Sequence, residues 1–124
     1  RAVSRPMMKA KGGAIVNVSS LSATSPSPMM VGYSTSKGAL NSFGHACAMA
    51  FADDNIRVNT VLPGLILTPR SNTVDADTMQ QFTKDIPMRR GGRPEEVAEM
   101  IVFLLSNRAS YITGGEFVVA GGER

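Results

Sequence analysis

A short β-branched strand, a long helix and a second short strand follow one another here, and this order constrains the fold more than any other feature. Residues 14–19 (AIVNVS) follow a glycine pair and precede a Ser/Pro-rich loop, which is typical of a buried strand. Residues 29–52 then predict one long helix, and residues 56–62 (IRVNTVL) predict a second strand that a Pro-Gly pair ends. Strands joined through a helix run parallel with a right-handed crossover, so both strands should end at the same edge of one sheet.

The remaining segments predict further elements of the same α/β kind. Residues 1–11 have a helix-like composition and end at a glycine pair, which is a typical stop signal. A polar stretch over residues 69–77 and a short helix near residues 78–84 predict a flap over the edge where the strands end. Pro94 fits the first position of another helix, and residues 116–119 (EFVV) predict a third strand. The sequence therefore predicts an α/β fold with about three strands and three to four helices.

Length and charge exclude several classes of protein. At 124 residues the chain forms at most one domain, and its net charge of +3 is too small to indicate a nucleic-acid partner. Its longest apolar run, residues 100–105, is far too short to span a membrane. The single cysteine, Cys47, permits no internal disulfide and fits a reducing, cytoplasmic location. We interpret the cationic cluster of Arg89, Arg90 and Arg93 as a solvated loop, with contact to an acidic substrate or carrier as the alternative.

Three separated parts of the sequence converge on the shared strand edge. Ser20 follows the first strand, residues 63–68 follow the second, and Tyr33 and Lys37 lie in the first turns of the long helix. Because Tyr33 and Lys37 are four residues apart, they face the same side of that helix. A fixed positive charge beside a phenol favours the phenolate, lowering the pKa from about 10, which suits a general acid–base near neutral pH. Open parallel sheets bind ligands beyond the carboxyl ends of their strands, so we expect a ligand site at this edge.

These residues belong to an ordered set of motifs that resembles the short-chain dehydrogenase/reductase family. The motifs are Asn17-Val-Ser-Ser20, Tyr33-x-x-x-Lys37, Pro63-Gly64-x-Ile66-x-Thr68 and Arg93-Pro94-Glu95-Glu96-Val97-Ala98, with a closing Gly-Gly pair. The Tyr-x-x-x-Lys pair alone is a weak signal, whereas the ordered set covers essentially the whole chain at the family's usual spacing. The resemblance implies a Rossmann-type doubly wound parallel sheet, of which this chain would be the C-terminal part.

The resemblance also implies a role for each matched residue. Ser20 would hydrogen-bond the substrate oxygen, Tyr33 would give or take the proton, and Lys37 would favour the phenolate and bind the nicotinamide ribose. The residues that would hold the nicotinamide end of NAD or NADP, besides Tyr33 and Lys37, are Pro63, Gly64, Ile66 and Thr68. The implied activity is hydride transfer between this cofactor and a small alcohol or ketone, in a dimer or tetramer. We predict no metal site, and we interpret His45, about two helical turns past Lys37, as structural.

Some features of such a protein fall outside this sequence. No Gly-x-Gly-x-x-Gly loop occurs in the chain, so neither the phosphate-binding half nor the choice between NAD and NADP can be read. We therefore interpret residues 1–124 as the catalytic half of a partial NAD(P)-binding domain, truncated at its N-terminus and inactive alone. Small residues on the long helix would suit close helix–helix packing in an oligomer: Gly32, Gly38, Ala39, Gly44, Ala46, Ala48 and Ala50.

Other interpretations of the same residues stay open at this point. Ser34 and Lys37 satisfy the Ser-x-x-Lys pattern of penicillin-recognising acyl-transfer enzymes, although the Ser-Asp-Asn and Lys-Thr-Gly elements of that class do not occur. A second alternative is an inactive fragment or interaction module. Of the two adjacent serines, the spacing favours Ser20 for the site, with Ser19 pointing into the sheet.

Overall fold

A three-stranded parallel sheet forms the centre of the molecule in the computed structural model, which describes residues 2–69 and 73–124. The strands lie in the order β1 (Gly13–Val18), β2 (Ile56–Pro63) and β3 (Glu116–Val119). Val18 pairs with Val61 near the end of β1, and β3 pairs with the second half of β2. The central strand β2 is therefore bonded along both edges, and all three strands end on the same side.

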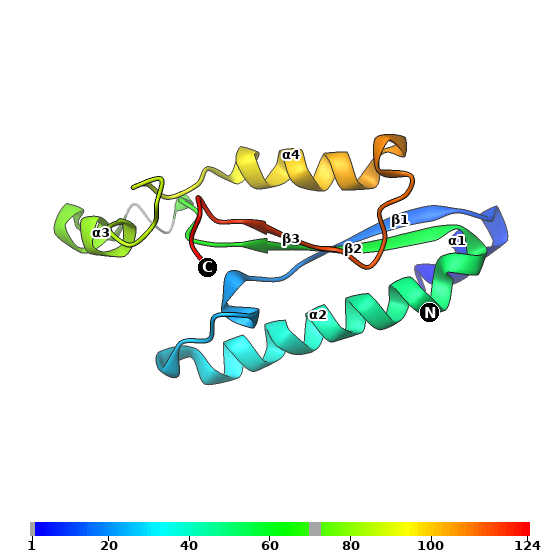
Figure 1. Ribbon diagram of the computed structural model, residues 1–124, viewed down its shortest axis with the longest axis horizontal. Helices are drawn as coiled ribbons and strands as arrows, with labels where there is room; N and C mark the ends of the chain where they lie inside the picture. The colour runs from blue at the N-terminus through cyan, green and yellow to red at the C-terminus, as the bar shows by residue number, and fades with distance from the viewer. Residues whose placement is uncertain (1, 70–72) are drawn as a thin grey trace.

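Helices cover both faces of this sheet (Figure 1). α1 (Ser4–Ala10) and the long α2 (Val31–Phe51) lie on one face, and α4 (Pro94–Leu105) lies on the other. α3 (Ala76–Thr83) stands apart, beyond the carboxyl ends of the strands. Short 3₁₀ turns connect these elements at Leu21–Ala23, Pro28–Met30, Ala52–Asp54 and Asn107–Ala109.

The two faces of β2 carry two separate hydrophobic clusters. Ile56 and Val58 pack with Ala48 of α2, while Val61 packs with Leu104 of α4. These four aliphatic side chains of β2 and α4 are at most 1% exposed. Each contributes roughly 1.5–3 kcal/mol when fully buried. A strand buried on both faces is typical of a parallel sheet, and even the polar Asn59 and Thr60 of β2 are only 2% exposed.

The small residues of α2 allow the helix to approach the sheet closely. Gly44 and Ala48 are both buried, and a Cβ at position 44 would lie 2.7 Å from Thr60 Oγ1 of β2. At these two positions the expectation of helix–helix packing is wrong, because the close approach is to the sheet. The reason is the crossover itself, which lays the helix across the strands that it connects.

The predicted fold class is confirmed, with three parallel strands and four helices within the described residues. The strand predicted at residues 116–119 matches β3 residue for residue. β1 begins and ends one residue earlier than predicted, and β2 ends one residue later. Part of the polar stretch predicted at 69–77 lies outside the described residues. Within those residues, none of the helices combines the length and apolarity that crossing a membrane requires.

Candidate active site

The carboxyl ends of β1 and β2 bring two loops together. The Ser19 amide donates to the Val61 carbonyl at 2.8 Å, and the Gly64 amide donates to the Val119 carbonyl at 3.1 Å. The parallel pairing thus continues one residue beyond each strand. Ser20 and the segment after Gly64 leave the sheet at the same edge, as the topology predicts.

The two adjacent serines have different partners. Ser20 caps the 3₁₀ turn Leu21–Ala23, where its Oγ accepts a hydrogen bond from the Ser22 amide at 3.1 Å. Ser19 is 4% exposed, and its Oγ donates to the Lys37 carbonyl of α2 at 3.2 Å. Ser19 therefore ties the end of the strand to the helix backbone, whereas the prediction had it pointing into the sheet.

Tyr33 and Lys37 lie on one side of the first two turns of α2, as their spacing predicts. The Lys37 ammonium is 5.7 Å from the centre of the Tyr33 ring, within the range of a cation–π contact. The same Nζ donates a hydrogen bond to the Val18 carbonyl at 3.0 Å. Tyr33 is 43% exposed, so its phenol is open to a ligand. The lysine is thus fixed between the tyrosine and the end of β1.

One cleft of about 450 Å³ brings together every residue that the sequence proposes for the site. Those residues are Ser20, Tyr33, Lys37, Pro63, Gly64, Ile66 and Thr68. Four further residues line the same cleft: Val18, Ser19, Pro94 and Val97. The cleft is therefore lined by four residues with a hydroxyl or phenol group and one with an ammonium, together with proline, isoleucine and valine side chains.

Besides Val18 and Ser19, which precede Ser20, sequence reasoning missed Pro94 and Val97 as lining residues. They belong to the first turn of α4, which lies on the opposite face of the sheet from α2. The only signal in the sequence is the family-like motif that begins at Arg93. That motif predicts the start of a helix and does not say what the helix covers.

A second, larger cavity of about 980 Å³ adjoins this cleft. Ile66 lines both cavities, and the larger one is bounded by Leu21, Leu65, Met88 and the chain around Gly121. Its apolar walls can accept the body of a molecule that is larger than the reacting group held in the cleft.

The acyl-transfer interpretation requires a nucleophilic serine beside Lys37, and the structure does not provide one. Ser34 is 6% exposed and its Oγ is buried without a hydrogen-bond partner, while the Lys37 ammonium is bonded to Val18. His45 lies on the exposed side of α2, where Nδ1 is 3.4 Å from the Gly114 carbonyl, consistent with a structural role. In the described part of the chain, no three His, Cys, Asp or Glu side chains lie close enough to hold a metal ion.

A guanidinium–carboxylate pair dominates the electrostatics at the start of α4. The hydrogen bonds from Arg90 are the largest of the causes that lower the pKa of Glu96 from its usual 4.5 to about 2. The Arg93 amide donates to the same carboxylate at 2.7 Å and lowers the pKa further. Both interpretations of the arginine cluster missed this pairing, in which Arg90 and Arg93 turn to a carboxylate of their own chain.

Comparisons with known proteins cover nearly the whole chain. The family model described as enoyl-(acyl carrier protein) reductase matches residues 1–123. The chain is 40% identical to the 3-oxoacyl-[acyl-carrier-protein] reductase of Chlamydia muridarum over 98% of its own length and 49% of the relative. It is 43% identical to the cyclopentanol dehydrogenase of Comamonas sp. over 98% of its length and 50% of that protein.

The solved structures extend the likeness to three dimensions. The 3-oxoacyl-[acyl-carrier protein] reductase of Brucella melitensis superposes with a TM-score of 0.94 at 36% identity, covering 99% of this chain and 46% of that one. The chain therefore belongs to the short-chain dehydrogenase/reductase family. It spans about half the length of the curated relatives it matches.

Proposed function

We propose that residues 1–124 are the catalytic half of an NAD(P)-dependent oxidoreductase that interconverts a small alcohol and its ketone. The observation that carries this proposal is the single cleft lined by Ser20, Tyr33, Lys37, Pro63, Gly64, Ile66 and Thr68. The relatives named for reduction of a 3-oxoacyl group and for dehydrogenation of cyclopentanol share this alcohol–ketone chemistry.

The chemistry of the cleft fits the nicotinamide-ribose end of such a cofactor. A ribose needs hydrogen-bonding partners such as the Lys37 ammonium, and a flat ring needs apolar contacts such as Ile66 beside a hydroxyl such as Thr68. When bound, the cofactor supplies or accepts the hydride. The 124 residues contain no glycine-rich loop for the pyrophosphate, so we expect the isolated chain to bind NAD(P) weakly and to show no turnover.

The side chains of this chain would manage the proton and orient the substrate. The Tyr33 phenol would give its proton to the ketone oxygen, or take it from the alcohol, as hydride moves at the adjacent carbon. Ser20 would hold the same oxygen by a hydrogen bond. The Lys37 ammonium, 5.7 Å from the Tyr33 ring, would stabilise the phenolate that remains.

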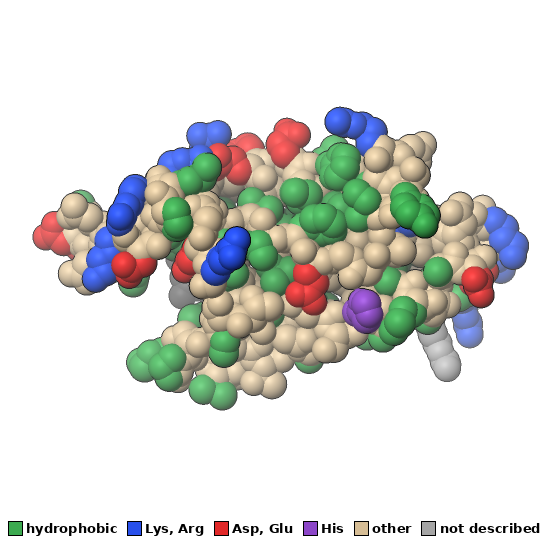
Figure 2. Space-filling view, in the orientation of Figure 1, with side chains coloured by type: hydrophobic (Ala, Val, Ile, Leu, Met, Phe, Trp, Pro, Cys, Tyr) green, Lys and Arg blue, Asp and Glu red, His purple; other side chains and the backbone are tan. Residues whose placement is uncertain are grey.

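An oligomer is part of this proposal, because the described residues expose an apolar surface. Figure 2 shows hydrophobic side chains gathered over α4 and the edge strand β3. Val102 and Leu105 of α4 and Val118 of β3 are each more than 40% exposed. Such a patch beside an unpaired strand edge is typical of a protein–protein contact. We also propose a cytoplasmic location, because a chain with a single cysteine forms no internal disulfide and fits a reducing compartment.

The test uses the full-length protein that contains these residues, with either nicotinamide cofactor and with a 3-oxoacyl thioester, cyclopentanone or cyclopentanol as substrate. Tyr33→Phe should lower kcat/KM by about 10²–10⁴-fold, which is the usual contribution of general acid–base catalysis. Tyr111→Phe is the matched control, because Tyr111 is the other tyrosine and its side chain is fully exposed. Undiminished hydride transfer by Tyr33→Phe would refute the role of Tyr33.

A further inference from the structure

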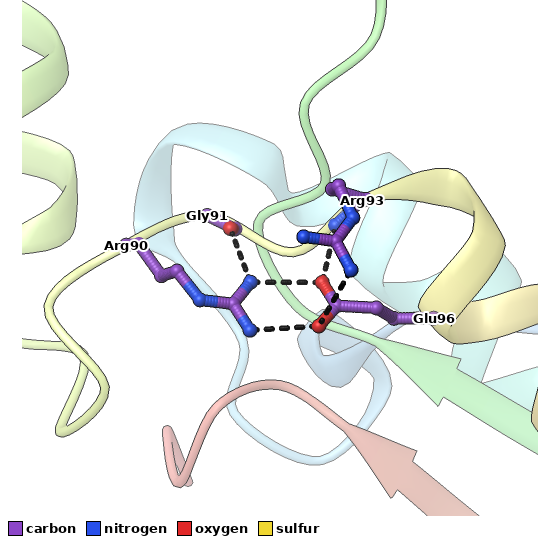
Figure 3. A network of polar contacts seen from close by, with 4 residues as sticks. All are labelled: Arg90, Gly91, Arg93 and Glu96. Atoms are coloured by element: carbon purple, nitrogen blue, oxygen red, sulfur yellow. Dashed lines mark hydrogen bonds and ion pairs between the residues drawn. The ribbon is translucent and has the colours of Figure 1, made fainter.

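A small polar network holds the loop that leads into α4 (Figure 3). Arg90 donates two parallel hydrogen bonds to the Glu96 carboxylate, at 2.8 Å to Oε2 and 2.7 Å to Oε1. Arg90 also donates to the Gly91 carbonyl at 3.1 Å, and the Arg93 amide donates to Glu96 Oε2 at 2.7 Å. Glu96 therefore caps the helix and fastens the preceding loop at the same time.

The fastened loop is paired with the segment that follows Gly64. The Gly92 amide donates to the Leu65 carbonyl at 2.9 Å, and the Leu67 amide donates back to the Gly92 carbonyl at 2.8 Å. These two bonds form a parallel bridge between Ile66 and Gly92. The backbone of residues 65–67 is thus held by a loop from a distant part of the sequence.

The Gly91–Gly92 turn and residues 65–67 lie so close together that a side chain in the turn would crowd its neighbours. A Cβ at position 92 would lie 2.8 Å from Ile66 Cδ1, and a Cβ at position 91 would lie 2.8 Å from the Leu67 side chain. The Ile66 or Leu67 side chain would have to shift to admit a Cβ at either position. The same loop is anchored at its other end, where Arg90 and Glu96 meet.

This anchoring reaches the candidate active site on two sides. Ile66 and Thr68, at one wall of the cleft, continue from the bridged backbone. Pro94 and Val97, at another wall, belong to the helical turn that Glu96 caps. The carboxylate itself faces the larger cavity, together with Arg90 and Gly92. Glu96 thus joins both walls without lining the cleft.

We propose that Glu96 is a positioning residue for cofactor binding. Through Arg90 and the Gly91–Gly92 turn, it fixes the backbone that presents Ile66 and Thr68 to the nicotinamide end of the cofactor. This inference depends on the function proposed above for the cleft.

The first test is a split between kinetic constants in the full-length protein. Glu96→Gln keeps the size of the side chain but removes the charge that pairs with Arg90, so the KM for the cofactor should rise about tenfold. The KM for the substrate should stay within twofold, which a general loss of structure would not produce. Glu95→Gln is the matched control, because Glu95 carries the same charge on the same first turn of α4 and is exposed. Its constants should not change.

The second test measures the backbone directly and needs no cofactor. In Glu96→Gln, amide hydrogen exchange at Leu67 and Gly92 should become about tenfold faster, with no change in Glu95→Gln. Unchanged exchange would overturn the proposal, and so would faster exchange with an unaltered cofactor KM, because the network would then serve stability alone. A wild-type protein that binds neither NAD nor NADP would refute the proposed function, and with it the cofactor role, while the exchange rates would still report whether Glu96 fixes the loop.

Discussion

The Lys37 ammonium donates a hydrogen bond to the Val18 carbonyl at 3.0 Å and so joins the second turn of α2 to the end of β1. Val18 is followed at once by Ser19, whose hydroxyl bonds back to the Lys37 carbonyl. Helix and strand are therefore tied twice through the same residue of the helix. Ser20 comes next in the chain, so these two bonds set its position relative to Tyr33.

Replacing Lys37 should remove both its bond to β1 and its charge beside Tyr33. Lys37→Met removes the bond to Val18 and the positive charge near the Tyr33 ring, so kcat/KM of the full-length protein should fall about 100-fold, the scale of a lost electrostatic stabiliser. Steady-state kinetics measure this loss. Lys9→Met, on the exposed side of α1, is the control and should behave as wild type. A twofold effect at Lys37 would contradict the assignment.

The adjacent serines should separate activity from stability. Ser20→Ala removes the hydroxyl proposed to hold the substrate oxygen, so kcat/KM should fall at least tenfold with little change in unfolding. Ser19→Ala removes a buried hydrogen bond, so the free energy of unfolding should fall by about 1 kcal/mol. Urea unfolding and steady-state kinetics on both variants show which serine serves activity and which serves stability. The reverse pattern would exchange the roles of the two serines.

The sequence predicts the fold and the membership of the cleft because both follow from local patterns and one topological rule. The run IRVNTVL and the long helix before it identify a parallel pair of strands, and the shared edge then collects Ser20, Tyr33 and residues 63–68. No knowledge of distant packing was needed for this step. Chain order therefore brings these segments to one edge, whereas the resemblance to the family singles out the individual residues.

The parts that the sequence does not predict depend on contacts between distant elements. Arg90 and Glu96 are six residues apart across a loop and a helix start, a spacing that matches no regular pairing rule. The bridge between Ile66 and Gly92 likewise needs the loop to fold back over the strand end. For the same reason, Gly44 suggests only that something approaches α2, and the structure identifies the sheet as the partner.

Two glycines of α2 should respond in opposite ways to alanine. At Gly44 a new Cβ would lie 2.7 Å from Thr60 Oγ1 and 2.8 Å from Asn17 Nδ2, so Gly44→Ala should lower the free energy of unfolding by about 1–3 kcal/mol. At Gly32 no heavy atom lies within 4 Å, so Gly32→Ala should be neutral or raise it by up to about 1 kcal/mol through helix propensity. Urea unfolding of the two full-length variants tests this contrast. Equal changes in the free energy of unfolding would contradict it.

Arg57 should contribute to the stability of the fold, because its contacts lie away from the cleft. Its guanidinium donates to the carbonyls of Leu104 at 2.7 Å, Ser106 at 3.0 Å and Ile112 at 3.3 Å, which closes the end of α4 against β2. Arg57→Met should therefore lower the free energy of unfolding by about 2–3 kcal/mol, since these bonds come from a charged donor.

The control for Arg57 is a second arginine near the same helix end. Arg108→Met removes a guanidinium that lies 5.6 Å from the Phe103 ring on the exposed surface, and it should cost about 1 kcal/mol or less. Thermal or urea unfolding measures both variants. Arg57→Lys should recover only part of the loss, because an ammonium cannot reproduce the fork that reaches three carbonyls.

The Arg90–Glu96 pair should give stability a defined dependence on pH. Its hydrogen bonds hold the pKa of Glu96 near 2, whereas the unfolded carboxyl titrates near 4.5. Because the pKa of Glu96 is lower in the folded state, the pair's contribution to the free energy of unfolding is complete above about pH 5. That contribution is lost as the pH falls from 4.5 toward 2. Urea midpoints of wild type and Glu96→Gln should therefore differ by a constant amount above pH 5 and converge below it. The difference between wild type and Glu95→Gln should show no such convergence, and parallel curves for Glu96→Gln across the whole range would contradict the pairing.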